Sequence, residues 1–182
     1  PGKIKPKALA VIHTLKIGGA ALAWILSREI LKTVSSQKST VNSSLELVSI
    51  GTIADQIPLL GANRSFVKYG LKALNKTKRL GLLTLFNQAA LEVGTIGPYE
   101  VGFIIAPRLN AMGRLEHAIE SLRLLCTKDI KRAEDLARQL SKTNLERQRV
   151  VDEVVLHALG QTQGKPSKGV IIVSHESYHE GV

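Results

Sequence analysis

The residue whose surroundings point most directly to chemistry is Asp55, in the segment LELVSIGTIADQIPLL. It is the only acid between Glu46 and Glu92, and its neighbours are almost all apolar. An ionised carboxylate in apolar surroundings is costly unless a cation, a metal ion or hydrogen-bond donors pair with it, so we expect a buried, paired side chain. Because Mg²⁺ and Mn²⁺ select carboxylate oxygen, Asp55 is a candidate metal ligand. The alternative is a structural aspartate that caps a turn ahead of Pro58 or pairs with Arg64.

A second group of polar residues lies in the segment APRLNAMGRL, which carries Arg108, Asn110 and Arg114. Asn110 and Arg114 would share one face if a helix continued here, but Pro107 and Gly113 favour a tight loop. Two guanidinium groups and an amide near one loop make a phosphate clamp, since arginine offers a planar bidentate fork. The alternative is a pair of solvated arginines around a helix-breaking loop.

A third group follows the β-branched run GVIIV at 169–173. His175, Glu176 and His179 all lie within six residues of that run, and residues just past the end of a strand often line sites in α/β sheets. A His-x₃-His pair on a helix can bind a metal. A solvated loop explains the same residues equally well.

The composition limits the class of protein. Of 182 residues, 44% are hydrophobic and 22% are charged, which is enough apolar material for a core. Lys and Arg outnumber Asp and Glu by 25 to 15, a net charge of +10 that suits a polyanion such as nucleic acid. A single cysteine, Cys126, fits a reducing cytoplasm. No apolar run reaches the ~18 residues of a membrane span, so we expect no membrane association.

The spacing of apolar residues predicts a mainly helical chain. Asn63 is the expected N-cap of one helix, and Pro98 opens another that Pro107 should bend or end. A polar loop is expected over 35–44. The expected helices cover 18–34 (buried), 63–74, 81–93, 98–107, 117–126 and 128–159, and the expected strands cover 8–12 and 169–173.

The longest helix lies between two compositionally different parts. From 128 to 159 there is no Gly or Pro, and apolar residues recur every three or four positions. Such a helix is roughly 45–50 Å long, which exceeds the width of a small domain, so we expect it to connect two. The chain begins at Pro1 and ends soon after a strand pattern, from which we expect an internal piece of a longer protein.

Several segments together resemble the DHH phosphoesterases. LELVSIGTIADQIPLLGANRSFVKYGL is similar to their GT-x-AD-x-x-PL…ENR-x-x-V-x-x-GL block, and APRLNAMGRL resembles the APR-[IL]-N-A-x-GR block of the RecJ-type exonucleases within that family. NLERQRV resembles the N-x-x-RQ stretch of their connecting helix. VSHESYHEGV resembles the WH-x-GV entry into their second domain, with Tyr178 in place of Trp. PKALAVIHT looks like the stretch after the Asp-His-His signature. The resemblance covers nearly the whole chain.

The resemblance implies an α/β parent with DHH/DHHA1 architecture, of which this chain is the mainly α part. Residues 1–126 would be the helical part of the catalytic domain, 127–160 the connecting helix, and 161–182 a linker and the start of the DHHA1-type domain. The implied activity is a 5′-to-3′ single-stranded-DNA exonuclease of DNA repair and recombination that is cytoplasmic and monomeric. It would use two Mn²⁺ or Mg²⁺ ions.

The resemblance also assigns roles to single residues. Asp55 stands where the family's last metal-binding, catalytic aspartate lies. Arg108, Asn110 and Arg114 fall where the family contacts substrate phosphate, and His179 matches a histidine at the border of the second domain.

The chain departs from the family pattern in the catalytic motifs. The Asp-x-Asp, the isolated Asp, the Asp-His-His signature and the late glycine-rich motif are not found here, and only one of four aspartates lies at a metal position. One carboxylate cannot hold two ions ~3.5–4 Å apart, so we expect these residues alone to be inactive. Two alternatives stay open. One is another superfamily enzyme acting on short oligonucleotides, cyclic dinucleotides or pyrophosphate, and the other is a non-catalytic, basic, nucleic-acid-binding helical module.

Overall fold

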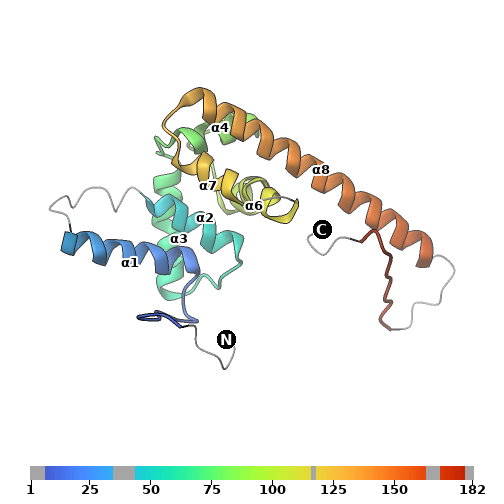
Figure 1. The fold of residues 1–182 in the computed structure, drawn as a ribbon, viewed down its shortest axis with the longest axis horizontal. Coiled ribbons are helices and arrows are strands. Elements are labelled where there is room, and N and C mark those ends of the chain that lie inside the picture. Colours follow the sequence, from blue (N-terminus) through green and yellow to red (C-terminus); the bar gives the residue numbers. More distant parts are fainter. Residues whose placement is uncertain (1–6, 35–43, 116–117, 163–168, 179–182) are drawn as a thin grey trace. The chain divides into compact units, whose positions relative to one another are not determined.

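A computed structural model describes residues 7–34, 44–115, 118–162 and 169–178, with the backbone alone at 114 and 115. Figure 1 shows the helices in sequence order. The helices are α1 (Gly19–Val34), α2 (Leu45–Ala54), α3 (Gly61–Leu74), α4 (Leu80–Gln88), α5 (Pro98–Glu100), the π-helix η2 (Val101–Ile105), α6 (Ala106–Leu115), α7 (Ile119–Cys126) and α8 (Ile130–Thr162). The prediction of a mainly helical chain is confirmed. No helix in the described ranges is both long enough and apolar enough to cross a bilayer.

The two predicted strands are absent from the described residues, so those predictions are wrong for this structure. Residues 8–12 and 170–175 have no regular secondary structure, and apolar side chains such as Val170 and Ile172 are 90% and 88% exposed. A β-branched run becomes a strand only when a neighbouring strand accepts its backbone hydrogen bonds. Neither run finds such a neighbour among the described residues.

The chain forms two compact units, Pro1–Ala73 and Leu74–Val182, which are described separately. In the first unit, α1 packs on α2, and Trp24 of α1 meets Phe66 of α3 edge-on, with ring centroids 5.8 Å apart. The expectation of a buried α1 is wrong, because Ala21 is its only described buried residue. Instead α2 is the buried element of this unit.

Helix α3 lies against α2 through a glycine. A Cβ at Gly70 would lie 2.5 Å from the Ser49 Cβ and 2.7 Å from the Leu45 carbonyl oxygen, so only glycine permits this approach. Asn63 is not the N-cap that its position predicted, because the helix already begins at Gly61. Its buried amide instead donates to the carbonyl oxygens of Lys16 (2.9 Å) and Pro58 (3.1 Å) and thereby attaches the preceding loops to α3.

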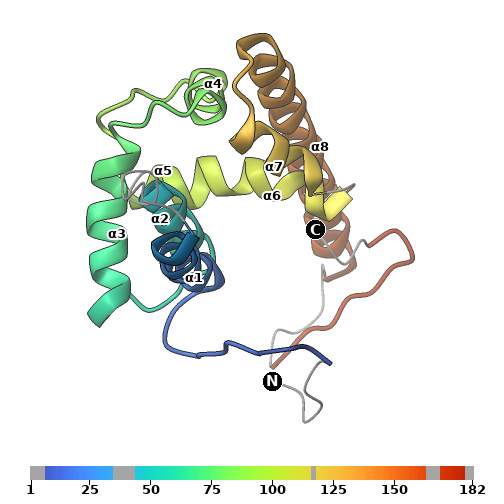
Figure 2. The same cartoon turned by 60° about the vertical axis from the view of Figure 1, so that its left-hand side comes forward.

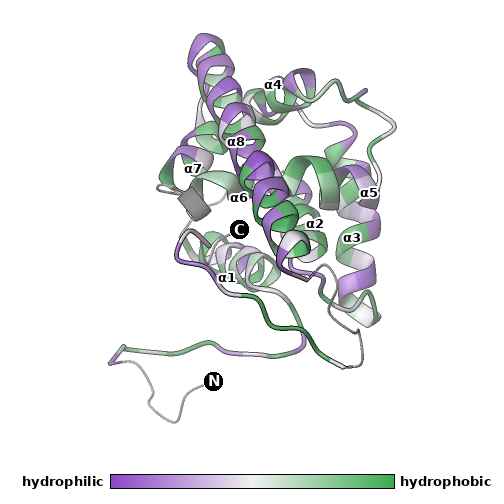
Figure 3. Cartoon of the chain, turned by 90° about the vertical axis from the view of Figure 1, so that its right-hand side faces the viewer, coloured by the Kyte–Doolittle hydropathy of each residue, from purple (hydrophilic) through white to green (hydrophobic). Residues whose placement is uncertain are grey.

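In the second unit, α4, α6 and α7 pack on α8, and Figures 1 and 2 both show them along the first half of that helix. The side chains that α8 buries are confined to this half: Ala133, Leu136, Ala137, Leu140, Thr143 and Asn144. Beyond them, hydrophobic and hydrophilic residues follow one another along α8 (Figure 3). Exposed apolar side chains here include Leu156 and Leu159.

Helices α4 and α7 approach each other closely at Gly81. A Cβ built on Gly81 would lie 1.9 Å from the carbonyl oxygen of Leu124, well inside van der Waals contact. Gly81 is buried beside the core residues Leu82, Leu85 and Leu124, which are all 0% exposed. The two helices can therefore pack at this distance only because position 81 has no side chain.

Candidate metal and nucleic-acid site

Asp55 lies at the C-terminal end of α2, where its backbone N–H donates to the Gly51 carbonyl oxygen at 3.0 Å. The side chain is exposed, so the expectation that its apolar neighbours bury it is wrong. The helix ends just before Asp55, Gln56 has a positive φ of 52°, and Leu59 and Leu60 are themselves exposed, so the apolar residues that follow form no core over the carboxylate. No ion pair with Arg64 or hydrogen bond to the carboxylate is formed within the described part of the chain. The carboxylate oxygens are thus free to accept a ligand.

The segment with Arg108, Asn110 and Arg114 is helical and not the tight loop that Pro107 and Gly113 predicted. Pro98 opens the helical path as expected, but Pro107 does not end it. Just before the proline the backbone widens into the π-helix η2, and the Ala106 N–H donates to the Val101 carbonyl oxygen, five residues back. A π-turn changes which carbonyls need donors, so the missing proline N–H is tolerated.

Arg108 is half-buried at this widened turn. Its Nη1 donates to the Ile104 carbonyl oxygen at 2.8 Å, whereas its Nε is buried without a hydrogen-bond partner. Burial lowers the pKa of the Arg108 guanidinium from its ordinary value, because desolvation disfavours the charged form. A buried charge-bearing donor without an acceptor is unfavourable, so Arg108 is well suited to receive an anionic oxygen.

Of the other predicted phosphate ligands, only Asn110 has a described side chain, and it does not lie beside Arg108. Asn110 is exposed, and it lies two residues further along α6, which turns it roughly 200° away from Arg108. Arg114 lies one helical turn beyond Asn110, and its side chain is outside the described residues. His179 is also outside the described residues. Asp55 belongs to the first unit and α6 to the second.

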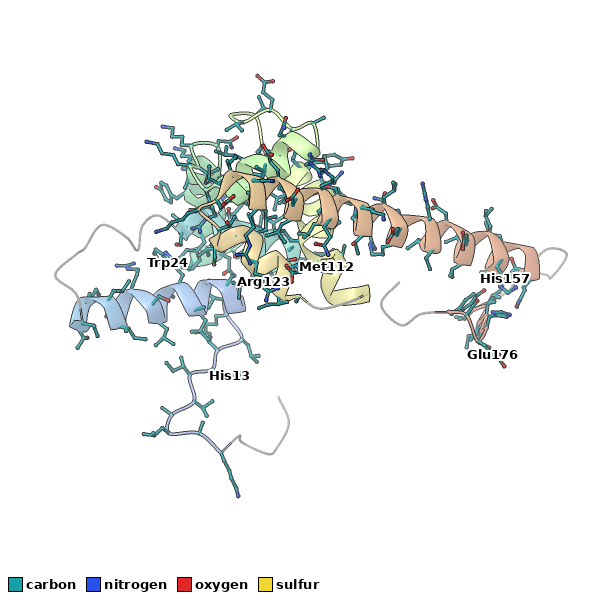
Figure 4. All side chains as sticks on the ribbon, turned by 45° about the horizontal axis from the view of Figure 1, so that its top comes forward. His13, Trp24, Met112, Arg123, His157 and Glu176 are labelled. Atoms are coloured by element: carbon teal, nitrogen blue, oxygen red, sulfur yellow. The ribbon has the colours of Figure 1, made fainter. Side chains whose placement is uncertain are left out.

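His175 and Glu176 are exposed and lie near the end of α8, as Figure 4 shows for Glu176 and His157. His175 stacks edge-on against His157, with ring centroids 4.7 Å apart. The Nδ1 of His157 is 2.8 Å from the Tyr178 hydroxyl. Sequence reasoning missed His157, because its partners follow 18 and 21 residues later and nothing local signals the contact.

Sequence reasoning also gave no role to a polar face of α8. Three of its buried atoms, Ser141 Oγ, Asn144 Oδ1 and Arg147 Nε, have no hydrogen-bond partner. They recur every three residues, so they follow one side of the helix. Asn144 is 2% exposed, so this side faces the interior of the second unit. The NLERQRV segment at 144–150, which contains Asn144 and Arg147, was the one part of the sequence that could have indicated this polar face.

The described residues contain no group of three or more His, Cys, Asp or Glu that could hold a metal ion. Asp55 can therefore be only one of several ligands. A single exposed carboxylate fits the donor chemistry of Mg²⁺ or Mn²⁺, but a complete site needs further oxygen or nitrogen donors.

Comparison with curated proteins finds similarity along the whole chain, although no protein-family model matches it. The chain is 32% identical over 192 residues to the single-stranded-DNA-specific exonuclease RecJ of Bacillus subtilis. It is 35% identical over 189 residues to the protein of the same name from Thermus thermophilus. Both matches cover 100% of this chain but 24% and 27% of the relatives, so the chain spans about a quarter of their length.

Comparison with solved structures also finds RecJ proteins. The RecJ structure from Thermus thermophilus in complex with Mn²⁺ matches 100% of this chain and 28% of its own, with a TM-score of 0.81 and 32% identity. A structure of exonuclease RecJ bound to manganese matches 88% of this chain and 42% of its own, with a TM-score of 0.75 and 33% identity.

Along its whole length the chain therefore matches, in sequence and in fold, a mainly helical segment of these proteins. More particularly, the chain is a RecJ-type sequence, as its motifs predicted.

Proposed function

We propose that the protein carrying these residues is a metal-dependent exonuclease that hydrolyses phosphodiester bonds of single-stranded DNA from the 5′ end in DNA repair and recombination. The observation that supports this most is the match along 100% of the chain to a RecJ structure in complex with Mn²⁺, at a TM-score of 0.81. Two relatives with the same full coverage are named as single-stranded-DNA-specific exonucleases.

The proposed architecture follows the DHH/DHHA1 pattern. Residues 1–126 contribute the helical part of a catalytic domain, 127–160 a connecting helix, and 161–182 the start of a second domain. The protein acts as a monomer. The single free cysteine, Cys126, favours the cytoplasm.

In this proposal Asp55 contributes one carboxylate to a site for two Mn²⁺ or Mg²⁺ ions. When bound, such ions supply an activated water and neutralise phosphoryl charge. Two things support this role: the position of Asp55 in a segment that resembles the family's metal-binding block, and the donor chemistry of a carboxylate. The exposure of the side chain does not support it, because no burial remains for a metal ion to offset. The remaining ligands would come from residues other than those described here.

Arg108 binds a phosphate of the strand in the same proposal. Its Nη1 bond to the Ile104 carbonyl fixes the plane of the guanidinium, so the remaining N–H groups are oriented before substrate arrives. Because this orientation is already fixed, a phosphate oxygen can be bound with little further loss of side-chain entropy. Asn110, Arg114 and His179 are proposed as further substrate contacts.

The test is cleavage of a 5′-labelled single-stranded oligonucleotide by the natural protein that carries this sequence, with Mn²⁺, Mg²⁺ or EDTA. We expect Asp55→Asn to lower turnover by about a hundredfold or more, since even the partners of metal ligands contribute 10–100-fold. DNA binding should be retained. Asp152→Asn, which removes an exposed carboxylate from α8, is the matched control and should cleave normally.

Two results would count against the proposal. Unchanged turnover and metal requirement in Asp55→Asn would remove Asp55 from the metal site. If the protein cleaves dinucleotides but not single-stranded DNA, the exonuclease assignment is wrong and the enzyme acts on short oligonucleotides.

A further inference from the structure

The outward face of α3 carries only positive charge. Arg64, Lys68 and Lys72 follow one another at four-residue spacing, and all three are exposed. The opposite face of α3 holds the buried residues, among them Val67 and Gly70. At 1.5 Å per residue the three cations span about 12 Å along one side of the helix.

This face differs from the other charged helix surfaces of the chain because it has no acid. No Asp or Glu occurs from position 56 to 91, and within the described ranges no ion pair involves a residue of α3. On α8, by contrast, Arg138 pairs with Asp135 and Lys142 with Glu146. Three unpaired cations in a row repel one another, and a polyanion removes that repulsion.

An aromatic ring lies within the same face. Tyr69 is 54% exposed, and the Nζ atoms of Lys68 and Lys72 each lie 5.8 Å from its ring centroid. An exposed ring between cations is the combination that single-stranded nucleic acids use, because a base can stack on the ring while the cations meet the backbone. A base within a duplex is already stacked, so the ring favours a single strand.

We propose that Arg64, Lys68, Tyr69 and Lys72, here called the α3 basic face, bind single-stranded DNA. The three cations contact successive phosphates, and Tyr69 stacks on a base. The three cations follow one another about 6 Å apart along the helix, so each can meet a separate phosphate of an extended strand. The choice of DNA as the nucleic acid rests on the proposed function. The charge pattern and the exposed ring are observations that do not depend on that function. This face adds a strand-binding surface to the phosphate contact proposed for Arg108.

The experiment measures binding of a fluorescent single-stranded oligonucleotide to the 182-residue chain in EDTA, by anisotropy at several salt concentrations. The test variant is Arg64→Gln with Lys68→Gln and Lys72→Gln. The matched control removes the same number of cations from α8, by Lys131→Gln with Arg138→Gln and Lys142→Gln. Far-UV circular dichroism checks that each variant keeps its helix content.

We expect the α3 variant to raise the Kd at least tenfold at low salt. Each lost phosphate contact on a single strand lowers the slope of log K against log salt by about 0.7, so three contacts lower it by about 2. The α8 control should change this slope by less than about 0.7, the value for one phosphate contact. Tyr69→Ala should weaken the binding of single-stranded DNA and leave the binding of duplex DNA unchanged.

An unchanged slope in the folded α3 variant would overturn the proposal, as would equal losses in the α3 and α8 variants. If the chain binds vesicles of anionic lipid more strongly than DNA, the proposal is wrong and the ligand of the α3 basic face is a membrane surface. Because EDTA excludes cleavage from this assay, failure of the α3 basic face is distinguishable from failure of the nuclease proposal, which is tested by metal-dependent turnover.

Discussion

The contact between α4 and α7 provides a sharp test of how the second unit packs. In Gly81→Ala the new Cβ would lie 1.9 Å from the Leu124 carbonyl oxygen and 2.6 Å from its carbonyl carbon. Ordinary contact begins near 3.4 Å, so α4 and α7 must separate by about 1.5 Å at this point. Gaps of 0.5–1 Å already lose a quarter to a half of the dispersion attraction between facing atoms.

The expected loss of stability follows from two opposing terms. Overpacking against backbone atoms belongs at the upper end of the usual range, about 3 kcal/mol. Alanine in place of glycine within a helix stabilises the fold by about 1 kcal/mol through its higher helix propensity. The net loss is about 2 kcal/mol, which lowers the Tm of a chain of this size by roughly 4–8 °C.

Urea or thermal unfolding followed by far-UV circular dichroism measures this loss. Gly160→Ala is the matched control, because Gly160 lies within α8 and a Cβ there meets nothing within 4 Å. The control should leave the free energy of unfolding unchanged or raise it by up to about 1 kcal/mol. If Gly81→Ala unfolds within ~0.5 kcal/mol of the control, the described approach of α4 and α7 is refuted.

Three further outcomes are expected. Arg108→Gln should weaken binding of single-stranded DNA and lower the salt slope by about 0.7; equal losses at all salt concentrations would contradict a phosphate contact. Asn75→Ala should cost about 2–3 kcal/mol, because the Asn75 side chain accepts from the Gly94 and Ile96 N–H groups and donates to the Ile96 carbonyl, and hydrogen exchange at Gly94 should speed up. The Cys126 thiol, which is exposed, should react with Ellman's reagent without denaturant, and a thiol protected until unfolding would place α7 differently.

The helices were predictable where their periodicity is local. The expected helix over 128–159 appears as Ile130–Thr162 and the one over 18–34 as Gly19–Val34, because each spacing of apolar residues belongs to a single helix. Helix α2 showed no such period, since most of its residues are apolar and several sides of it are buried.

The features that sequence reasoning missed depend on residues distant along the chain or on backbone detail. The π-turn ahead of Pro107 keeps Arg108 on a helix, and no residue type announces it. The exposure of Asp55 depends on which way the end of α2 points. The metal-ligand role of Asp55 stays a prediction from its residue type, whereas the exposure of its side chain could not be predicted from the sequence.

The long helix α8 has a mechanical consequence. Its buried residues stop at Asn144, so the following 18 or so residues form an arm of about 27 Å that would act as a lever about its anchored half, the pivot. A tilt of about 10° at the pivot moves the far tip by roughly 5 Å. Whatever is joined to that tip is thus displaced by amounts comparable to the spacing between nucleotides, through changes at the anchor too small to disrupt its packing.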